Sequence, residues 1–288
     1  MLGVVKPFPD TNPMISVKTI RTVTGATLHD ELHHKSIYFL GGVAVLFVFL
    51  LRGCFNNDVV MNGQKLDGAT IGWHASLIAF HLIASAGVLI AVLLGMRVLR
   101  RDRTDGTAVA ILSRPVRRIE YLLGKCLGVW IIAYGLTFIL HVTVYGIMLL
   151  KTGGRIGFFL PASLLISMNV LFAVVSVVLL AQFLPDIVAA LVASGIWLVG
   201  YISDAIYMAS QTGMVKNVLE QMQRPETSIA LWRVIWPKMT ALQYYGVARI
   251  KDVPFHVPGP VHPAVNVSFY VVAVFVLLYL HFSREEIR

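Results

Sequence analysis

The sequence predicts an all-α transmembrane protein built as a six-helix bundle. Hydrophobic residues make up 57% of the 288 residues and charged residues only 14%, a composition that would leave large apolar patches on a water-soluble protein. The apolar residues gather in runs of roughly 20, the length that crosses a hydrocarbon core of about 30 Å. The basic residues, which give a net charge of +9, gather beside these runs and indicate membrane topology rather than nucleic-acid binding.

Six apolar runs define the expected spans. They cover residues 36–51, 71–96, 121–150, 158–183, 187–208 and 264–282. Pro185 and Asp186 break the chain between the fourth and fifth runs, because proline cannot continue a helix. The first run is short for a span and needs Lys35 to reach the headgroup region. We therefore expect a membrane domain over residues 36–288, preceded by an N-terminal segment, residues 1–35.

The N-terminal segment carries a weak helical pattern. Residues 15–35 mix apolar and charged side chains with a loose helical period, which predicts an amphipathic helix on the membrane surface. A disordered, threonine-rich leader is the alternative, since Gly25 weakens the pattern. The segment lacks an apolar core long enough for a signal peptide, so we expect the first span to remain in the mature protein.

The basic residues of the short connections predict the orientation in the membrane. If both termini lie on one side, that side carries four basic residues before the first span, eight between Arg97 and Lys125, and two in the tail, against four on the other side. This asymmetry places both termini in the cytoplasm. Cys54 and Cys126 then lie on opposite sides, so we expect no disulfide between them.

The segment 209–263 then lies outside. It contains Trp232, Trp236, Tyr244 and Tyr245 among several prolines, a composition typical of short helices at the membrane interface. A re-entrant element is the alternative. The segment is left out of the orientation argument because long loops follow the charge rule poorly.

The stretch from Arg97 to Lys125 leaves the second span with a burst of positive charge and then returns to the membrane. Pro115 suits the first turn of a short helix there, since a proline at that position loses no hydrogen bond, and Ser113 is a candidate N-cap. These residues predict a small rigid lever between two spans. The alternative is a basic loop that fixes topology and contacts only lipid headgroups.

This stretch contains three motifs, Asp105-Gly106-Thr107, Leu112-Ser113-Arg114-Pro115-Val116 and Glu120-Tyr121-Leu122-Leu123-Gly124-Lys125. In spacing and polarity they resemble the signature of type-2 ABC exporter permeases. Weaker likenesses follow the family's order along the chain. They are residues 28–35 with Glu31, similar to an N-terminal interfacial helix, Ile235-Trp236-Pro237, similar to the segment before the last span, and Arg284-Glu285-Glu286, similar to a charged ending.

The resemblance implies that the loop between the second and third spans forms a cytoplasmic coupling helix seated in a groove of a separate ATPase. It also implies a cytoplasmic ATPase dimer that binds ATP and Mg, a second permease copy or homologue, export as the direction, and the bacterial inner membrane as the location. The residues it implicates are Asp105, Gly106, Thr107, Ser113, Arg114, Pro115, Val116, Arg117, Arg118 and Glu120. The chain departs from many members by placing Arg100, Arg101 and Arg103 around Asp102, where those members have a glutamate-rich run.

The sequence contains no phosphate-binding loop of the form G-x-x-x-x-G-K-[ST]. Gly124-Lys125-Cys126 lacks both the earlier glycine and the hydroxyl residue that such a loop requires. We therefore expect no nucleotide site, no catalytic residue, no metal and no cofactor in this chain. The energy for its work would come from another polypeptide.

Polar side chains within the spans are candidates for function, because ionisable groups at bilayer depth are costly. His81 and His141 fall at similar depth on antiparallel spans, where they could ligate a haem or a metal. The alternative is that both are neutral and hydrogen-bonded to neighbouring helices. Asn169 is the third candidate. Asp204 is expected near the outer end of the fifth span, close enough to water to need no special role.

Three other functions compete with an ATP-driven permease. An ion-coupled carrier would place acidic or paired charges near the midplane, and the sequence shows none there. A membrane haem protein would use His81 and His141. A membrane anchor would pass force from an ATPase to an outer partner through residues 209–263 without transport. The substrate is not indicated, since spans rich in Val, Leu and Ile describe any lipid-facing helix.

Overall fold

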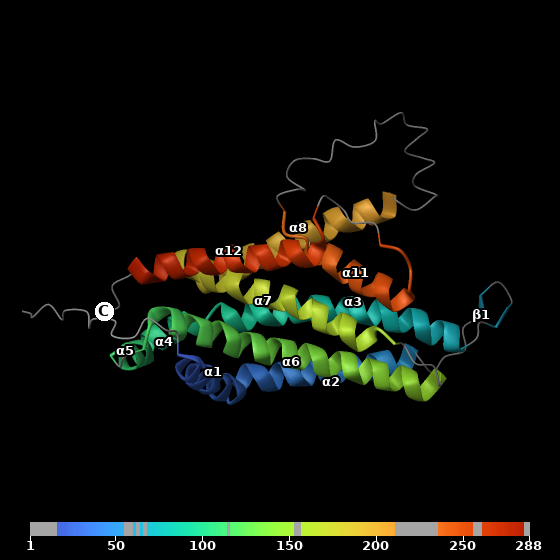
Figure 1. Cartoon of the computed structure of the whole chain (residues 1–288). Coiled ribbons are helices and arrows are strands. Elements are labelled where there is room, and N and C mark those ends of the chain that lie inside the picture. The colour runs from blue at the N-terminus through green and yellow to red at the C-terminus, as the bar shows by residue number, and fades with distance from the viewer. Residues whose placement is uncertain are drawn as a thin grey trace, which may run out of the picture.

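A bundle of long helices forms the body of the molecule (Figure 1). The computed structural model describes residues 16–54, 60–61, 64–65, 68–113, 116–152, 157–210, 236–255 and 261–284. The long helices are α2 (Lys35–Cys54), α3 (Gly68–Gly95), α6 (Arg118–Thr152), α7 (Phe159–Phe183), α8 (Asp186–Ser210) and α12 (Pro263–Arg284). The shorter elements are α1 (Val17–Leu32), α4 (Val98–Thr104), α5 (Thr107–Leu112), α11 (Met239–Lys251) and the antiparallel pair β1 (Val60–Met61) and β2 (Gln64–Lys65).

Five helices of the described residues are long and apolar enough to cross a membrane. They are α3 continued by α4, then α6, α7, α8 and α12, and they coincide with the second to sixth expected spans. Helix α2, the first expected span, meets the same test only together with α1, from which it is bent by 69°. The prediction of a helical, multi-pass membrane protein is confirmed, with five spans, or six if the bent pair counts as one.

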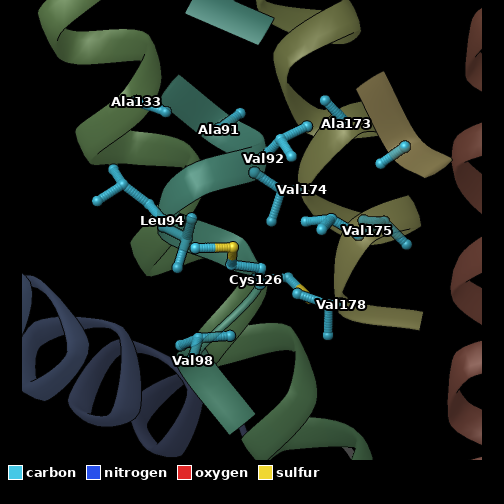
Figure 2. Packing of buried hydrophobic residues seen from close by; sticks show 14 of the residues in the cluster. Ala91, Val92, Leu94, Val98, Cys126, Ala133, Ala173, Val174, Val175 and Val178 are labelled. Atoms are coloured by element: carbon cyan, nitrogen blue, oxygen red, sulfur yellow. The ribbon is translucent and has the colours of Figure 1, made fainter. Parts of the chain in front are cut away.

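Helices α3, α6 and α7 pack closely at the centre of the bundle, and small and β-branched side chains fill their contacts (Figure 2). Two glycines of α3 bring the backbones together. A Cβ atom at Gly87 would overlap the Thr137 side chain of α6, and one at Gly95 would lie 2.6 Å from Val177 Cγ1 of α7. In lipid, helices associate by such close packing because the hydrophobic effect does not distinguish lipid from an apolar helix face.

The connection between α3 and α6 differs from the expected lever in its helix boundaries. The short helix α5 ends before Ser113, and the long helix α6 begins at Arg118. Ser113 is the C-cap of α5, and its hydroxyl donates to the Ala110 carbonyl oxygen at 2.9 Å. The predicted N-cap role of Ser113 is therefore wrong. Arg114 and Pro115 lie outside the described residues.

Helix α11 lies inside the bundle, where the sequence predicted helices at the membrane interface. Most of its residues are buried, and it packs chiefly on α7. Near its start, the amide of Asn169 donates to the Met239 carbonyl oxygen at 2.7 Å, and near its end the Arg249 guanidinium lies 4.8 Å from the Phe158 ring centroid. Asn169 is ten residues into α7, and Phe158 directly precedes the first residue of α7. Helix α11 therefore begins part-way along α7 and runs antiparallel to it, back to the start of α7. Helix α11 is therefore buried among the long helices, an arrangement that the re-entrant alternative requires and that a helix resting on the outside of the bundle would lack.

Two further polar side chains hold the start of α11. Asp204 of α8 accepts a hydrogen bond from the Ala241 N–H at 2.9 Å, and Asn266 of α12 accepts one from the Lys238 N–H at 2.8 Å. Both satisfy N–H groups that a helix start leaves without intrahelical partners. Asp204 is only 4% exposed, so the expectation that it faces water without a role is wrong. Residues 211–235 and 256–260 of the predicted outer segment lie outside the described residues.

Candidate functional site

The arginine-rich elbow, residues 97–125, lies at the end of the bundle where α12 also ends (Figure 1). Gly106 turns the chain between α4 and α5 with a φ of 70°, a left-handed conformation that glycine adopts without strain. The N–H of Asp105 donates to the Arg101 carbonyl oxygen at 2.9 Å and closes α4. The motif Asp105-Gly106-Thr107 thus forms the turn that leads into α5.

Three arginines of α4 reach three different helices. The contacts are Arg100 Nη1 to Asp186 Oδ1 of α8 at 3.1 Å, Arg101 Nη1 to Glu31 Oε1 of α1 at 3.7 Å, and Arg103 Nη2 to Gln182 Oε1 of α7 at 2.5 Å. The Arg103 guanidinium also lies 5.9 Å from the ring centroid of Phe282 on α12. Pairs in which the arginine stays partly exposed to water are individually weak. Together, however, they connect the short helix α4 to four other helices and so fix its position relative to them.

Asp102, between these arginines, points into the protein. Its Oδ2 lies 2.6 Å from Lys125 Nζ and accepts a hydrogen bond from the Tyr121 hydroxyl. Lys125 and Asp102 are 3% and 6% exposed, and the Lys125 ammonium lies 5.8 Å from the Tyr121 ring centroid. A buried carboxylate needs such partners, since desolvation of an unpaired charge costs several kcal/mol. The triad Asp102, Tyr121 and Lys125 joins α4 to the first turns of α6.

Helix α1 is seated directly on α6 beside this triad. A Cβ atom at Gly124 would lie 2.6 Å from Val23 Cβ, and one at Gly128 would lie 2.6 Å from Thr27 Cβ. The two glycines are one helical turn apart, as in the G-x-x-x-G pattern that lets helix backbones approach closely. The segment is therefore a helix and not a disordered leader, and its buried side lies against protein.

Glu120 and Arg118 face inward, although the resemblance implicates both in contacts with an ATPase. Glu120 is 2% exposed, and its carboxylate accepts hydrogen bonds from the N–H groups of Ser16 at 2.6 Å and Arg117 at 3.3 Å. Arg118 Nη1 donates to the carbonyl oxygens of Phe282 at 2.8 Å and Ser283 at 2.9 Å. These side chains tie α6 to the starts and ends of its neighbours, and Glu120 has no surface to offer a partner.

The outward surface of the elbow belongs to α5 and the turn before it. Val109 is 46% exposed. Thr107, Val116 and Arg117 are half-buried behind this surface. The exposed residues of the surface are Asp105, Gly106, Val109, Ala110 and Ser113. We call these five residues the α5 face. It offers small and apolar side chains, with one carboxylate at its edge.

Glu31 stands where α1 meets the elbow. Its side chain is largely buried, and burial raises the pKa of its carboxyl group above the usual value, while the positive charges of Arg101 and Lys125 act in the opposite direction. Burial thus disfavours the charged form of Glu31, and the contact with Arg101 favours it.

The histidines within the spans do not form a pair of free ligands. His141 is fully buried, its Nδ1 accepts from the Ser163 hydroxyl at 2.8 Å and its Nε2 lies 3.3 Å from the Phe80 carbonyl oxygen. Both ring nitrogens are thus engaged, as the neutral, hydrogen-bonded alternative requires. His81 lies instead beside Tyr244, with ring centroids 5.0 Å apart. Among the described residues, no group of three or more His, Cys, Asp or Glu is placed to hold a metal ion.

Residues 39–287 match the family described as ABC-2 family transporter protein. The chain belongs to the ABC-2 transporter family. No curated protein matches the sequence. ABC-2 membrane proteins are membrane components of ABC transporters without a nucleotide-binding site of their own, and they generally work with a cytoplasmic ATPase. The predicted membership of the type-2 ABC permeases is confirmed. Helix α1 precedes the matched residues.

Sequence reasoning missed the partners of the elbow. The pairing of Asp102 with Lys125 and Tyr121 had one visible signal, since Tyr121 and Lys125 are four residues apart and share a helix face. The inward direction of Glu120 had no such signal, because the shorter of its two hydrogen bonds comes from a backbone N–H more than a hundred residues away in the chain.

Proposed function

We propose that the chain is the permease subunit of an ABC exporter and that a separate cytoplasmic ATPase drives it through the α5 face. The observation that carries the proposal is the set of contacts made by four consecutive residues of α4. Arg100, Arg101, Asp102 and Arg103 reach α8, α1, α6 and α7 respectively. A displacement of the elbow is therefore passed to most of the bundle at once.

The mechanical path runs from the α5 face through α4 into α6. Asp102 and Lys125 are buried and 2.6 Å apart, so α4 and α6 move together. Helix α6 continues from Arg118 to Thr152 without a break, a length of about 52 Å at 1.5 Å per residue. A tilt imposed at its first turns reaches the far end of the bundle. Packed helices change position by such rigid shifts rather than by continuous bending.

The assembly we propose contains two permease chains and two ATPase subunits in the bacterial inner membrane, with both termini of the chain in the cytoplasm. The orientation is supported by the arginines gathered at the elbow. Export as the direction is supported by the resemblance to type-2 exporters. The ATPase would bind ATP and Mg, and the permease would open to each side of the membrane in turn.

The test is co-purification of the chain from its native membranes, with matched variants at two exposed valines. Val109 on the α5 face is 46% exposed and Val253, just after the outer end of α11, is 47% exposed. Val109→Asp should lose a co-purifying polypeptide that carries a phosphate-binding loop and hydrolyses ATP, because a carboxylate desolvated in an apolar contact weakens it. Val253→Asp should retain that polypeptide. Absence of any ATP-hydrolysing partner from the unmodified chain would overturn the proposal.

A further inference from the structure

Helix α11 meets α3 and α7 along a contact that contains polar side chains from all three helices, buried on α7 and α11 and half-buried at His81 of α3. We call it the α11 seam, and define it as His81 of α3, Asn169 of α7, and Thr240 and Gln243 of α11. Asn169 and Gln243 are fully buried, and Thr240 is 1% exposed. Asn169 lies ten residues into α7, so the seam is about 15 Å from the end of that helix at 1.5 Å per residue.

The four side chains lie close together along α11. Gln243 is beside His81, and the neighbouring Tyr244 ring has its centroid 5.0 Å from the His81 ring. Thr240 is one helical turn before Gln243, and it follows Met239, whose carbonyl oxygen accepts the hydrogen bond from Asn169 at 2.7 Å. The seam is therefore continuous from the start of α11 to its second turn.

The seam leaves five polar atoms without a hydrogen bond inside the described part of the chain. These atoms are Asn169 Oδ1, Thr240 Oγ1, Gln243 Oε1 and Nε2, and His81 Nδ1. Buried polar atoms in native proteins are nearly always paired with protein or with ordered water. Other buried polar atoms without such a bond, Tyr134 Oη, Ser176 Oγ and Trp197 Nε1, lie singly on three different helices, whereas five gather in the seam. Such a gathering calls for a ligand.

We propose that the α11 seam is an internal hydration site, in which bound water completes the hydrogen bonds of these five atoms. The chemistry of the seam fits water, because it presents donors and acceptors together and none of its four side chains bears a formal charge when His81 is neutral. A buried water needs two to four polar partners, and the seam offers such partners on three helices. This inference does not depend on the proposed transport function.

Methionine oxidation by radiolytically generated hydroxyl radicals tests the proposal, since the radicals form from water and label side chains that touch it. Met239, which directly precedes Thr240 of the seam, and Met148 of α6 are equally buried, at 3% and 4% exposed, and each belongs to an apolar cluster. The full chain in lipid nanodiscs would be irradiated and digested, and oxidation followed by mass spectrometry. We expect Met239 to oxidise several-fold faster than Met148. Equal rates would overturn the proposal.

A double variant separates water held by the seam from water that reaches Met239 by another route. Thr240→Val with Gln243→Leu removes three of the five unpaired atoms while keeping similar side-chain volumes. We expect Met239 oxidation to fall toward the Met148 rate, with no loss of thermal stability. A folded double variant whose Met239 still oxidises at the original rate would overturn the proposal. If the double variant fails to fold, the comparison of Met239 with Met148 in the unmodified chain still decides.

Discussion

At the scale of single residues, the main feature of the elbow is the buried carboxylate of Asp102. Asp102 has Lys125 Nζ at 2.6 Å and the Tyr121 hydroxyl as partners. A buried ion pair adds little net stability, because desolvation offsets the attraction between the charges. Removal of one partner has a large effect, since it leaves the other charge alone in a poorly hydrated setting. The pair therefore fixes how α4 meets α6 more than it stabilises the fold.

Lys125→Met should destabilise the chain by about 3–5 kcal/mol, the usual effect of leaving a buried charge unpaired. Thermal unfolding in detergent followed by circular dichroism would measure it. The control is Asp105→Asn, whose side chain is 58% exposed and whose substitution should stay within about 0.5 kcal/mol. The double variant Asp102→Asn with Lys125→Met should recover part of the loss. A Lys125→Met melting temperature equal to that of the control would show that the pair is not buried as described.

Asp204→Ala should loosen the start of α11, because the Ala241 N–H loses its acceptor. Loss of a helix cap costs about 1–2 kcal/mol, so amide hydrogen exchange in residues 239–245 should accelerate roughly tenfold. Asp252→Asn, at the exposed far end of α11, serves as the control and should leave these amides unchanged. Unaltered exchange in Asp204→Ala would remove the capping role.

At the scale of the helices, two glycines of α6 allow α1 to pack closely against it. Gly124 and Gly128 leave the space that Val23 and Thr27 fill. Gly135, further along α6, has no atom within 4 Å of where its Cβ would lie. A larger side chain at Gly124 or Gly128 should therefore displace α1, whereas the same side chain at Gly135 should leave α1 in place.

Gly124→Leu should release α1 from α6, while Gly135→Leu should not. Lys18 and Arg21 are exposed on α1 and are sites for trypsin, which cuts a released and frayed helix much faster than a docked one. Limited trypsin digestion of the two variants, read by mass spectrometry, would compare cleavage after these residues. Equal cleavage in both variants would contradict the docking of α1.

The elements that the sequence predicted well are the long apolar ones. Expected residues 158–183 became Phe159–Phe183, and 71–96 became Gly68–Gly95, because length and hydropathy alone decide a span. Helix α11 could not be placed in this way. It has only thirteen residues of mixed polarity, and its position depends on Asp204 and Asn169, which are distant in the chain.

For the candidate site, the sequence predicted a stretch of chain but not how its side chains lie. The elbow motifs mark Asp105 to Lys125, which follow α4 and lead into α6, and their role at an ATPase stays a prediction. The resemblance could not tell inward from outward side chains. Glu120 is buried against α1 while Val109 is exposed, a difference set by tertiary packing that neither charge nor periodicity records.

At the scale of the whole molecule, the elbow joins α1, α6, α7, α8 and α12 at one end of the bundle. The α5 face is the exposed part of that elbow. A partner that moves α5 thus moves the ends of most helices together, which is what an energy-supplying subunit requires of the chain it drives. Our central claim is that an ATPase contacts this face.

Site-specific photocrosslinking tests that claim most directly. A benzoylphenylalanine placed at Val109, or at the equally exposed Val253 beyond the end of α11, would be irradiated in native membranes and the adducts identified by mass spectrometry. We predict an adduct with a polypeptide carrying a phosphate-binding loop at position 109 and none at position 253. An ATPase adduct at position 253, or its absence at position 109 in membranes where the ATPase is present, would contradict the account.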